Sequence, residues 1–204
     1  MDTLFLVLTG SCSKACPFCF YRTGYLDHPA EELTTGEAIL ALERAKELQA
    51  KSVIFTGGEP LIRTDFPEIA RAAGRLGLRR LLLSGGVFPG RPGSGIGLRE
   101  LAEAVAFSVN SLAEAERLER SAGLLAEFPP DAVTVTTVFH RENLADLPAL
   151  VDWAGRKGWG MILQPAFIPR ASPLRPRFSP SALSGVEWLS YSRPCQVQGS
   201  RHTN

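Results

Sequence analysis

The feature that most constrains the fold of this chain is an alternation between residues 4 and 168, where short β-branched apolar runs are followed by longer amphipathic runs. The short runs are typical of buried strands, and the longer runs are typical of helices that pack on a sheet. The predicted strands are Leu4–Leu8, Ser52–Phe55, Arg80–Leu83, Ala104–Val109, Ala132–Phe139 and Gly160–Gln164. The predicted helices are Thr35–Gln49, Asp65–Leu76, Leu98–Glu103, Leu112–Ala126 and Leu144–Arg156. Strands separated by helices in this way form an α/β fold with a parallel sheet and right-handed crossovers.

Two architectures fit this pattern, an open doubly wound sheet and a partial barrel of βα units. In both, the loops that follow the strands gather at the carboxyl ends of the sheet, so a functional site is expected there. Thr34 or Thr35, followed by Glu37 or Ala38, predicts the start of the first helix without a complete capping box. Asn143 predicts an N-cap for the last helix.

The composition limits the class of protein. A chain of 204 residues, with 45% hydrophobic and 21% charged residues, has the size and balance of one globular domain. Its formal net charge of +1 does not indicate nucleic-acid binding. No apolar run reaches the ~20 residues that span a bilayer, and the apolar start lacks the basic region of a signal peptide. We therefore expect a cytoplasmic protein without a membrane partner, in a reducing compartment where clustered cysteines indicate metal or redox chemistry.

Three of the four cysteines directly follow the first predicted strand, with the spacing Cys12-x3-Cys16-x2-Cys19. Thiolates at this spacing can converge on one metal centre, and three thiolates on a four-iron cluster would leave one iron open to a ligand. Three other interpretations stay open at this point. They are a zinc site completed by His28 or Cys195, a redox dithiol formed by Cys16 and Cys19, and unrelated buried thiols.

A second motif, Gly57-Gly58-Glu59-Pro60, ends the second predicted strand. Glycines at this point let the backbone approach a ligand closely and expose its amides and carbonyls, and Glu59 adds an acceptor. The alternative is a simple turn before the helix that begins at Asp65. Because the two motifs lie one βα unit apart, both are expected at the same end of the sheet.

Together, the cysteine motif, Phe18 just before its last cysteine, and the Gly57–Pro60 motif resemble the radical S-adenosylmethionine (SAM) superfamily, in its MoaA-like and peptide-modifying members. The resemblance implies a partial (β/α)6 barrel of parallel strands with outer helices, over residues 1–168. It implies that Cys12, Cys16 and Cys19 hold a [4Fe–4S] cluster, whose fourth iron is chelated by the amino and carboxylate groups of SAM. One electron from the cluster would cleave SAM to methionine and a 5′-deoxyadenosyl radical, which abstracts hydrogen from a substrate.

The resemblance also implies how SAM would be held. Phe18 would lie near the adenine, and the segment from Gly57 to Pro60 would receive the SAM amino group through its carbonyls and Glu59. Ser84, which ends the third strand, is a further candidate for contact with SAM, and it is followed by Gly85, where relatives often carry the side-chain amide of Asn. Ser108 and Asn110 share one strand face and are candidates for contact with the ribose or carboxylate, although Asn110 or Ser111 would equally cap the next helix.

Other polar residues are weaker candidates for the barrel interior or the surroundings of the cluster: Lys14, Arg22, Thr134, Thr136, His140, Arg141 and Gln164. His140 is either an acid or base on the substrate side or an ordinary loop histidine. Lys14 and Arg22 either balance the charge of the thiolates or are ordinary surface charges.

The last segment, residues 169–204, is a tail rich in Pro and Arg. We expect it to be either truncated relative to the family or partly disordered. A short chain leaves the side of a partial barrel open, which would suit a large substrate such as a peptide or protein. The resemblance further implies an electron donor such as a flavodoxin or ferredoxin. The alternatives are a glycyl-radical activase and a non-catalytic module that binds a metal or cluster.

Overall fold

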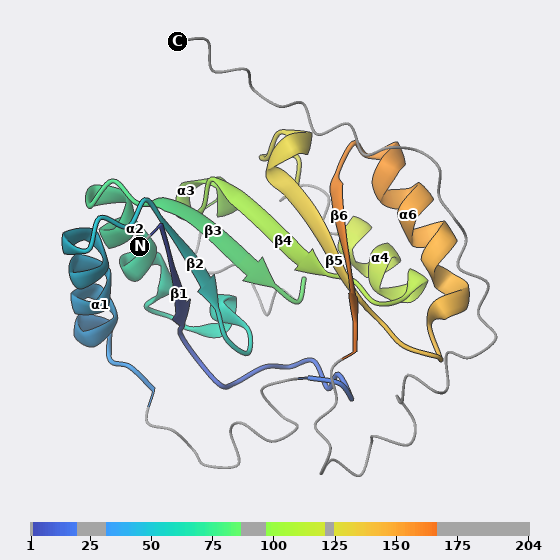
Figure 1. The fold of residues 1–204 in the computed structure, drawn as a ribbon, viewed down its shortest axis with the longest axis horizontal. Coiled ribbons are helices and arrows are strands. Elements are labelled where there is room, and N and C mark those ends of the chain that lie inside the picture. Colours follow the sequence, from blue (N-terminus) through green and yellow to red (C-terminus); the bar gives the residue numbers. More distant parts are fainter. Residues whose placement is uncertain (1, 20–31, 87–96, 121–124, 167–204) are drawn as a thin grey trace.

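A computed structural model of the chain describes residues 2–19, 32–86, 97–120 and 125–166. The strands are β1 (Thr3–Val7), β2 (Ser52–Thr56), β3 (Arg79–Ser84), β4 (Ala104–Ser108), β5 (Val133–Phe139) and β6 (Gly160–Pro165). The α-helices are α1 (Thr35–Glu47), α2 (Phe66–Arg75), α3 (Leu98–Leu101), α4 (Leu112–Glu119) and α6 (Leu147–Arg156). Short 3₁₀ helices are η2 (Pro60–Ile62), η3 (Pro130–Ala132) and η4 (Leu144–Asp146). Each predicted strand and helix is therefore present (Figure 1).

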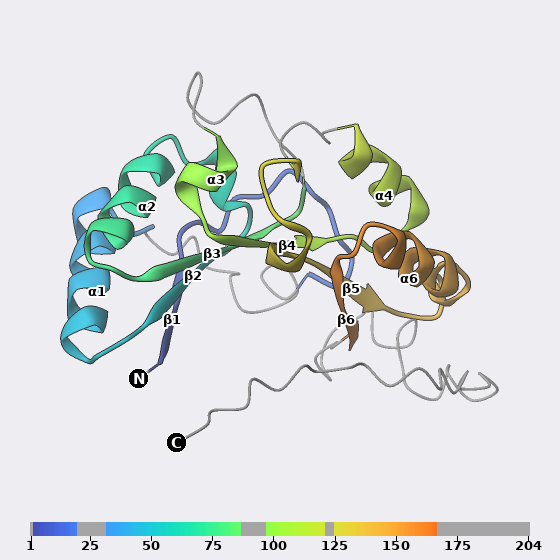
Figure 2. The same cartoon turned by 90° about the horizontal axis from the view of Figure 1, so that it is seen from above.

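The six strands form one parallel sheet in the order β1-β2-β3-β4-β5-β6. A doubly wound sheet would reverse its strand order at a switch point, and this sheet does not. Among the described residues, β1 and β6 pair with no further strand, so the sheet stays open. Right-handed crossovers in a strictly sequential order place every helix on one face, which Figure 2 shows. The partial barrel is thus confirmed, and the doubly wound alternative is excluded.

The hydrophobic core lies between the helices and the sheet. Every second strand residue faces it, as with Val53 and Phe55 in β2, which are both fully buried. Phe55 meets Phe66 of α2 edge to face, with the ring centroids 5.2 Å apart. The other sheet face is less covered, and Phe5 on β1 is 64% exposed there. This second face, opposite the helices, is called the inner face below.

Polar side chains of β4, β5 and β6 lie on the inner face. Ser108 pairs in register with Thr136, and Thr136 pairs with Ile162. Neighbours in a parallel sheet point to the same side, and the alternating residues Val105 and Phe107 point into the core. Thr134 and Gln164 alternate in the same sense as Thr136 and Ile162. The predicted orientation of Thr134, Thr136 and Gln164 toward the barrel interior agrees with this register.

The start of α1 corrects one prediction. Thr34 and Glu37 form a complete capping box, in which the Thr34 hydroxyl accepts from the Glu37 amide and the Glu37 carboxylate accepts from the Thr34 amide. The sequence pattern had suggested an incomplete box, because Thr34 and Thr35 compete for the N-cap position. Because Thr34 is the N-cap, Glu37 occupies N3, the position from which its side chain reaches back to the N-cap amide.

Two other helix ends differ from the predictions. Asn143 does not cap α6, because Asp146 precedes that helix and Asn143 uses its side chain to fasten the loop after β5. The helix α4 ends at Glu119, short of the predicted Ala126, and the Arg120 amide donates to the carbonyl of Glu116. Apolar residues continue past this point at Leu124 and Leu125, which favours a longer helix in the sequence although Gly123 lies between.

Within the described ranges, no helix has the length and apolar character that crossing a bilayer requires. The predicted tail, residues 169–204, lies outside the described residues, as do His28, Arg22 and Cys195. The predicted division at residue 168 stays a prediction.

Candidate functional site

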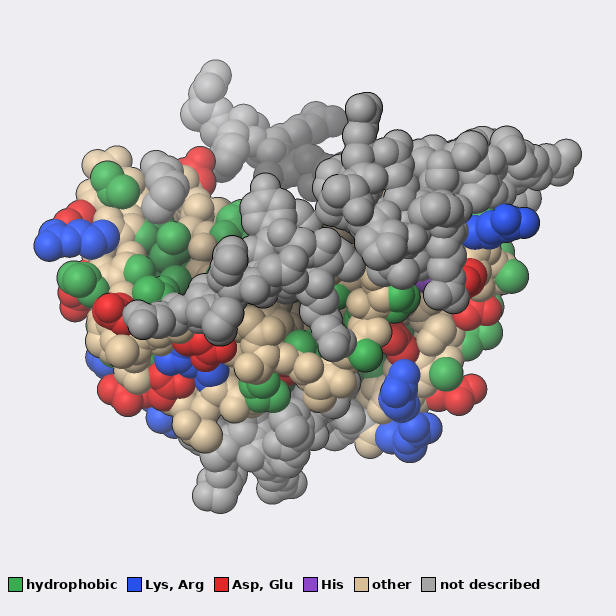
Figure 3. All heavy atoms as spheres, turned by 90° about the horizontal axis from the view of Figure 1, so that it is seen from below, with side chains coloured by type: hydrophobic (Ala, Val, Ile, Leu, Met, Phe, Trp, Pro, Cys, Tyr) green, Lys and Arg blue, Asp and Glu red, His purple; other side chains and the backbone are tan. Residues whose placement is uncertain are grey.

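The predicted site residues lie where the strands end. The cysteine motif follows β1, the Gly57–Pro60 motif follows β2, and Ser84, Ser108 and His140 stand at the ends of β3, β4 and β5. In Figure 1 these strands run toward the same edge. Figure 3 views the molecule from that edge and shows hydrophobic side chains among acidic and basic groups. The topology therefore gathers the two motifs and the later candidates at one end of the barrel.

The two glycines pack against the chain that leads from β1 to the cysteines. The Gly58 amide donates to the Thr9 carbonyl over 2.6 Å, and the Glu59 amide donates to the Ser11 carbonyl over 2.9 Å. A Cβ atom at Gly57 would overlap the Thr9 carbonyl oxygen, and one at Gly58 would overlap that of Ser11. Gly57 also has φ of 138°, which side-chain-bearing residues rarely adopt. Backbone contact with the cysteine loop is therefore one reason for glycine here, apart from any approach to a ligand.

The same chain is fastened from its other side. The Arg63 guanidinium donates to the Leu8 carbonyl over 2.7 Å and forms an ion pair with Asp65, which also accepts from the Thr35 hydroxyl. These bonds hold the pKa of Asp65 at about 2, below its ordinary value of 3.8, chiefly through the hydrogen bonds from Arg63. The end of β1 is thereby connected to the starts of α1 and α2.

Glu59 turns its carboxylate inward. The side chain is 1% exposed and accepts from the Gly85 amide at 2.7 Å, the Ser84 hydroxyl at 3.0 Å and the Leu61 amide at 3.2 Å. Burial raises the pKa of Glu59, and these hydrogen bonds together with the charge of Lys14 act against that rise. Glu59 and Ser84, both predicted to contact SAM, thus also connect the end of β2 to the end of β3.

Cys12, Cys16 and Cys19 are half-buried, are not paired in disulfides and lie on one loop. The Cys19 amide donates to the Cys16 carbonyl over 3.1 Å, and the Lys14 amide donates to the Cys12 sulfur over 3.3 Å. Burial raises the pKa of Cys16; the charge of Lys14 lowers it, and Glu114, Cys19 and Cys12 raise it further. Cys16 therefore lies within electrostatic range of both Cys12 and Cys19.

A donor set of three cysteine thiols fits a [4Fe–4S] cluster, for which thiolates are the usual protein ligands. In the part of the chain that the structure describes, no three His, Cys, Asp or Glu side chains are grouped to hold a single metal ion. Both residues considered as a fourth zinc ligand, His28 and Cys195, lie outside the described residues.

Phe18 brings the cysteine loop to the end of β5. Its ring centroid lies 5.3 Å from that of His140, with the planes tilted by 46°. His140 is itself fixed, because its amide donates to the Asn143 side chain over 2.8 Å. The rings of Phe18 and His140 are therefore in contact across the barrel, which the sequence did not indicate.

Asn110 connects β4 to β5. Its side-chain oxygen accepts from the Val138 amide at 2.8 Å, and its side-chain nitrogen lies 3.3 Å from a Glu114 carboxylate oxygen. Ser111, and not Asn110, caps α4, since the Ser111 hydroxyl accepts from the Glu114 amide. Asn110 is predicted to contact SAM, but its side chain already has hydrogen-bond partners within the protein.

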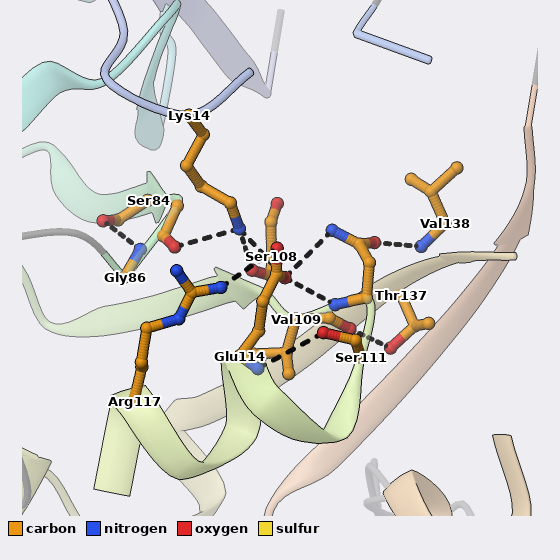
Figure 4. Close-up of polar contacts among 12 residues, drawn as sticks. Lys14, Ser84, Gly86, Ser108, Val109, Ser111, Glu114, Arg117, Thr137 and Val138 are labelled. Carbon is orange, nitrogen blue, oxygen red and sulfur yellow. Dashed lines mark hydrogen bonds and ion pairs between the residues drawn. The ribbon is translucent and has the colours of Figure 1, made fainter. Parts of the chain in front are cut away.

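Sequence reasoning missed Glu114, gave Asn143 only as a helix cap, and did not foresee the contacts of Lys14. Figure 4 shows Lys14 reaching down from the cysteine loop toward Ser108 and Glu114. Asn143 donates to the carbonyls of Asn110 and Val138. No local pattern signals the contacts of Lys14 with Ser108 and Glu114, or that of Asn143 with Asn110, because these join segments that are distant in the chain.

The sequence of this chain is similar to those of known proteins. The family model described as the radical SAM superfamily matches residues 6–154. The PqqA peptide cyclase of Gluconobacter oxydans (strain 621H) is 31% identical over 171 residues, which cover 78% of this chain and 48% of that protein. The PqqA peptide cyclase of Xanthomonas oryzae pv. oryzae (strain MAFF 311018) is 28% identical over 200 residues, which cover 84% and 52%. The chain thus spans about half the length of the curated relatives it matches.

Solved structures have the same fold. Streptococcus suis SuiB bound to S-adenosylmethionine superposes with a TM-score of 0.66 at 15% identity, covering 83% of this chain and 42% of SuiB. SuiB bound to the precursor peptide SuiA superposes with a TM-score of 0.62 at 16% identity, covering 81% and 39%. The family model covers most of the chain, including the cysteine and Gly57–Pro60 motifs, the end of β1 and the strands β2 to β5. On this evidence, the chain belongs to the radical SAM superfamily, a family of enzymes.

Proposed function

We propose that this chain is the catalytic core of a radical SAM enzyme that acts on a peptide, with a [4Fe–4S] cluster held by Cys12, Cys16 and Cys19. The observation that carries the proposal is the loop itself. Three half-buried thiols follow β1 on one short loop, Cys16 lies within electrostatic range of the other two, and the backbone before them is bonded to Gly58 and Glu59. When bound, the cluster with SAM would supply a 5′-deoxyadenosyl radical that abstracts hydrogen from the substrate.

In this proposal, the protein's own residues orient SAM and limit its contact with water. Phe18, fixed against His140, would face the adenine. The carbonyls of the segment from Gly57 to Pro60 would accept from the amino group of SAM. The hydroxyl of Ser108, on the inner face beside Thr136, would donate to the ribose or carboxylate. Asn110, Glu59 and Ser84 would act mainly through the backbone they hold.

Two separate observations support a peptide substrate. The curated relatives are cyclases of the peptide PqqA, and SuiB has been solved with its precursor peptide SuiA. The inner face also carries exposed apolar side chains, with Phe5 at 64%, Val7 at 44% and Ile162 at 48%. An apolar, partly uncovered face suits a peptide better than a small polar metabolite. A flavodoxin or ferredoxin would supply the electron.

The test is electron paramagnetic resonance on anaerobically reconstituted, dithionite-reduced protein, with and without SAM. We expect a [4Fe–4S]⁺ signal that changes shape when SAM is added, and loss of that signal in Cys12→Ala, Cys16→Ala and Cys19→Ala. Cys195→Ala is the control and should keep the signal. A signal that ignores SAM, or a cluster that survives Cys12→Ala, would contradict the proposal and favour a binding module or a dithiol enzyme.

Substrate class is tested on the same preparation by the yield of 5′-deoxyadenosine. Peptides should raise this yield above the uncoupled background and should themselves change in mass. Tight coupling to a small metabolite alone would overturn the peptide assignment and leave the radical chemistry in place.

A further inference from the structure

The ammonium group of Lys14 lies at the junction of three elements. It donates to the Ser108 carbonyl at 2.9 Å, to a Glu114 carboxylate oxygen at 3.0 Å and to the Gly85 carbonyl at 3.2 Å. The Lys14 side chain is 11% exposed, although it belongs to the loop between Cys12 and Cys16. Figure 4 shows it pointing away from that loop toward the end of β4. A lysine buried with its three donors occupied is not an ordinary surface charge.

Glu114 is a rigid partner for this ammonium. The same carboxylate oxygen accepts from the Asn110 amide at 2.7 Å, and the other lies 4.0 Å from Arg117 on the next turn. The Glu114 side chain is 18% exposed and stands in the first turn of α4, where the helix dipole favours a negative charge. The ion pair is thus largely buried and hydrogen-bonded on both sides, which is the condition under which such a pair is retained.

Gly85 provides the space that Lys14 occupies. A Cβ atom at this position would lie 2.7 Å from Cδ of Lys14 and 3.3 Å from a carboxylate oxygen of Glu59. Cδ cannot move aside freely, because the ammonium beyond it is held by its three acceptors. The side chain of Lys14 thus occupies the space beside Gly85 that a larger residue would need. Lys14 and Gly85 are therefore a matched pair.

We propose that Lys14 is a positioning residue, which fixes the Cys12–Cys19 loop to the ends of β3 and β4 and to α4, and that Gly85 keeps its path open. The bonds of Gly58 and Glu59 hold the loop before Cys12, and Lys14 holds it between Cys12 and Cys16. The proposal rests on the proposed function only in naming the cluster as the group that the fixed loop presents. The attachment itself is a property of the protein chain.

The first experiment compares Lys14→Met with wild type by hydrogen exchange in the cluster-free chain of 204 residues. Methionine keeps the apolar stem and removes the charge. Lys14→Met removes three charge-assisted hydrogen bonds, and the loss of even one predicts roughly tenfold faster exchange, so we expect at least that change in the peptide spanning Cys12 to Cys19, with the β2 and α2 peptides unchanged. Lys51→Met is the matched control, because the Lys51 side chain is 83% exposed, and it should exchange as wild type does. Unchanged exchange of the loop in Lys14→Met would overturn the proposal.

The second readout is spectroscopic. After reconstitution, we expect Lys14→Met to hold less iron than wild type and to give a broadened cluster signal with a weaker response to SAM. A merely structural loss would lower stability without altering the signal of the cluster that does form. If Lys14→Met does not fold, Glu114→Gln removes the same ion pair from the helix side and is judged by the same measurements.

The matched pair is tested by a double-mutant cycle on melting temperature. Gly85→Ala should lower the melting temperature of wild type, and the loss should be clearly smaller in the Lys14→Ala background, where Cδ is absent. Equal losses in both backgrounds would overturn the pairing. Wild-type protein that takes up no cluster would defeat the proposed function, whereas the hydrogen exchange of the cluster-free loop would still decide the role of Lys14.

Discussion

The Gly58 amide donates to the carbonyl of Thr9 over 2.6 Å, so the loop after β2 is bonded to the chain that connects β1 to the cysteines. Parallel neighbours place these two loops side by side, and the missing side chain at Gly58 lets their backbones touch. The order of the cysteine loop thereby depends on a residue that contributes no functional group.

Gly58→Ala is expected to destabilise the protein by about 1–3 kcal/mol, because the new Cβ would overlap the Ser11 carbonyl and the backbone would have to shift. Urea unfolding of the cluster-free protein measures this cost, and iron content after reconstitution should also fall. The control is Gly155→Ala in α6, where a Cβ meets nothing within 4 Å. That change should be neutral or stabilising by up to about 1 kcal/mol. Equal stability of both variants would show that the loops after β1 and β2 can accommodate a Cβ atom at position 58.

Asp65 predicts a specific acid sensitivity. Its folded pKa of about 2 lies below the ordinary 3.8, so its stabilising contribution is present above pH 4 and is lost as the pH falls through 2. The contribution is up to about 2 kcal/mol, since one pKa unit corresponds to 1.36 kcal/mol. Asp65→Asn should therefore be less stable than wild type at pH 7, and the difference should shrink toward pH 2. Denaturant unfolding of the cluster-free protein across this range measures it. A difference that does not change with pH would mean that the ion pair with Arg63 contributes nothing through the charge of Asp65.

The capping box of α1 gives a third prediction. Thr34→Ala removes the acceptor for the Glu37 amide and should lower the melting temperature by about 2–4 °C. Thr34→Ser keeps the hydroxyl and should melt close to wild type. If Thr34→Ser falls as far as Thr34→Ala, the methyl group of Thr34, and not its hydrogen bond, is what supports the helix.

Contact between Phe18 and His140 predicts an effect on SAM binding. Aromatic pairs contribute about 0.5–1.5 kcal/mol beyond their buried area, so Phe18→Ala and His140→Ala should each weaken SAM binding by roughly two- to tenfold. His140→Phe preserves an aromatic partner and should bind SAM nearly as wild type does. Equilibrium binding of SAM to the reconstituted protein measures all three. An effect of Phe18→Ala alone would mean that Phe18 acts on SAM without depending on His140.

Local sequence was sufficient for the elements and for the two motifs. The alternation of β-branched runs with amphipathic runs predicted all six strands, because both patterns act within a single element. The spacing of Cys12, Cys16 and Cys19 likewise placed three thiols on one short loop without reference to the rest of the fold. Where neighbouring residues compete for one role, as at Thr34 and Thr35, the pattern predicted the helix start but not its hydrogen bonds.

Tertiary structure decided what lies against those loops. The choice between a doubly wound sheet and a partial barrel depends on strand order, which no local pattern contains. Lys14 and Glu114 are one hundred residues apart in the chain, and only the curvature and register of β3, β4 and α4 bring them within 3.0 Å. The inward turn of Glu59 has the same origin, because its donors come from the end of β3. Short-range sequence therefore determined which groups this protein possesses, and packing between distant segments determined which of them are committed to holding the site together.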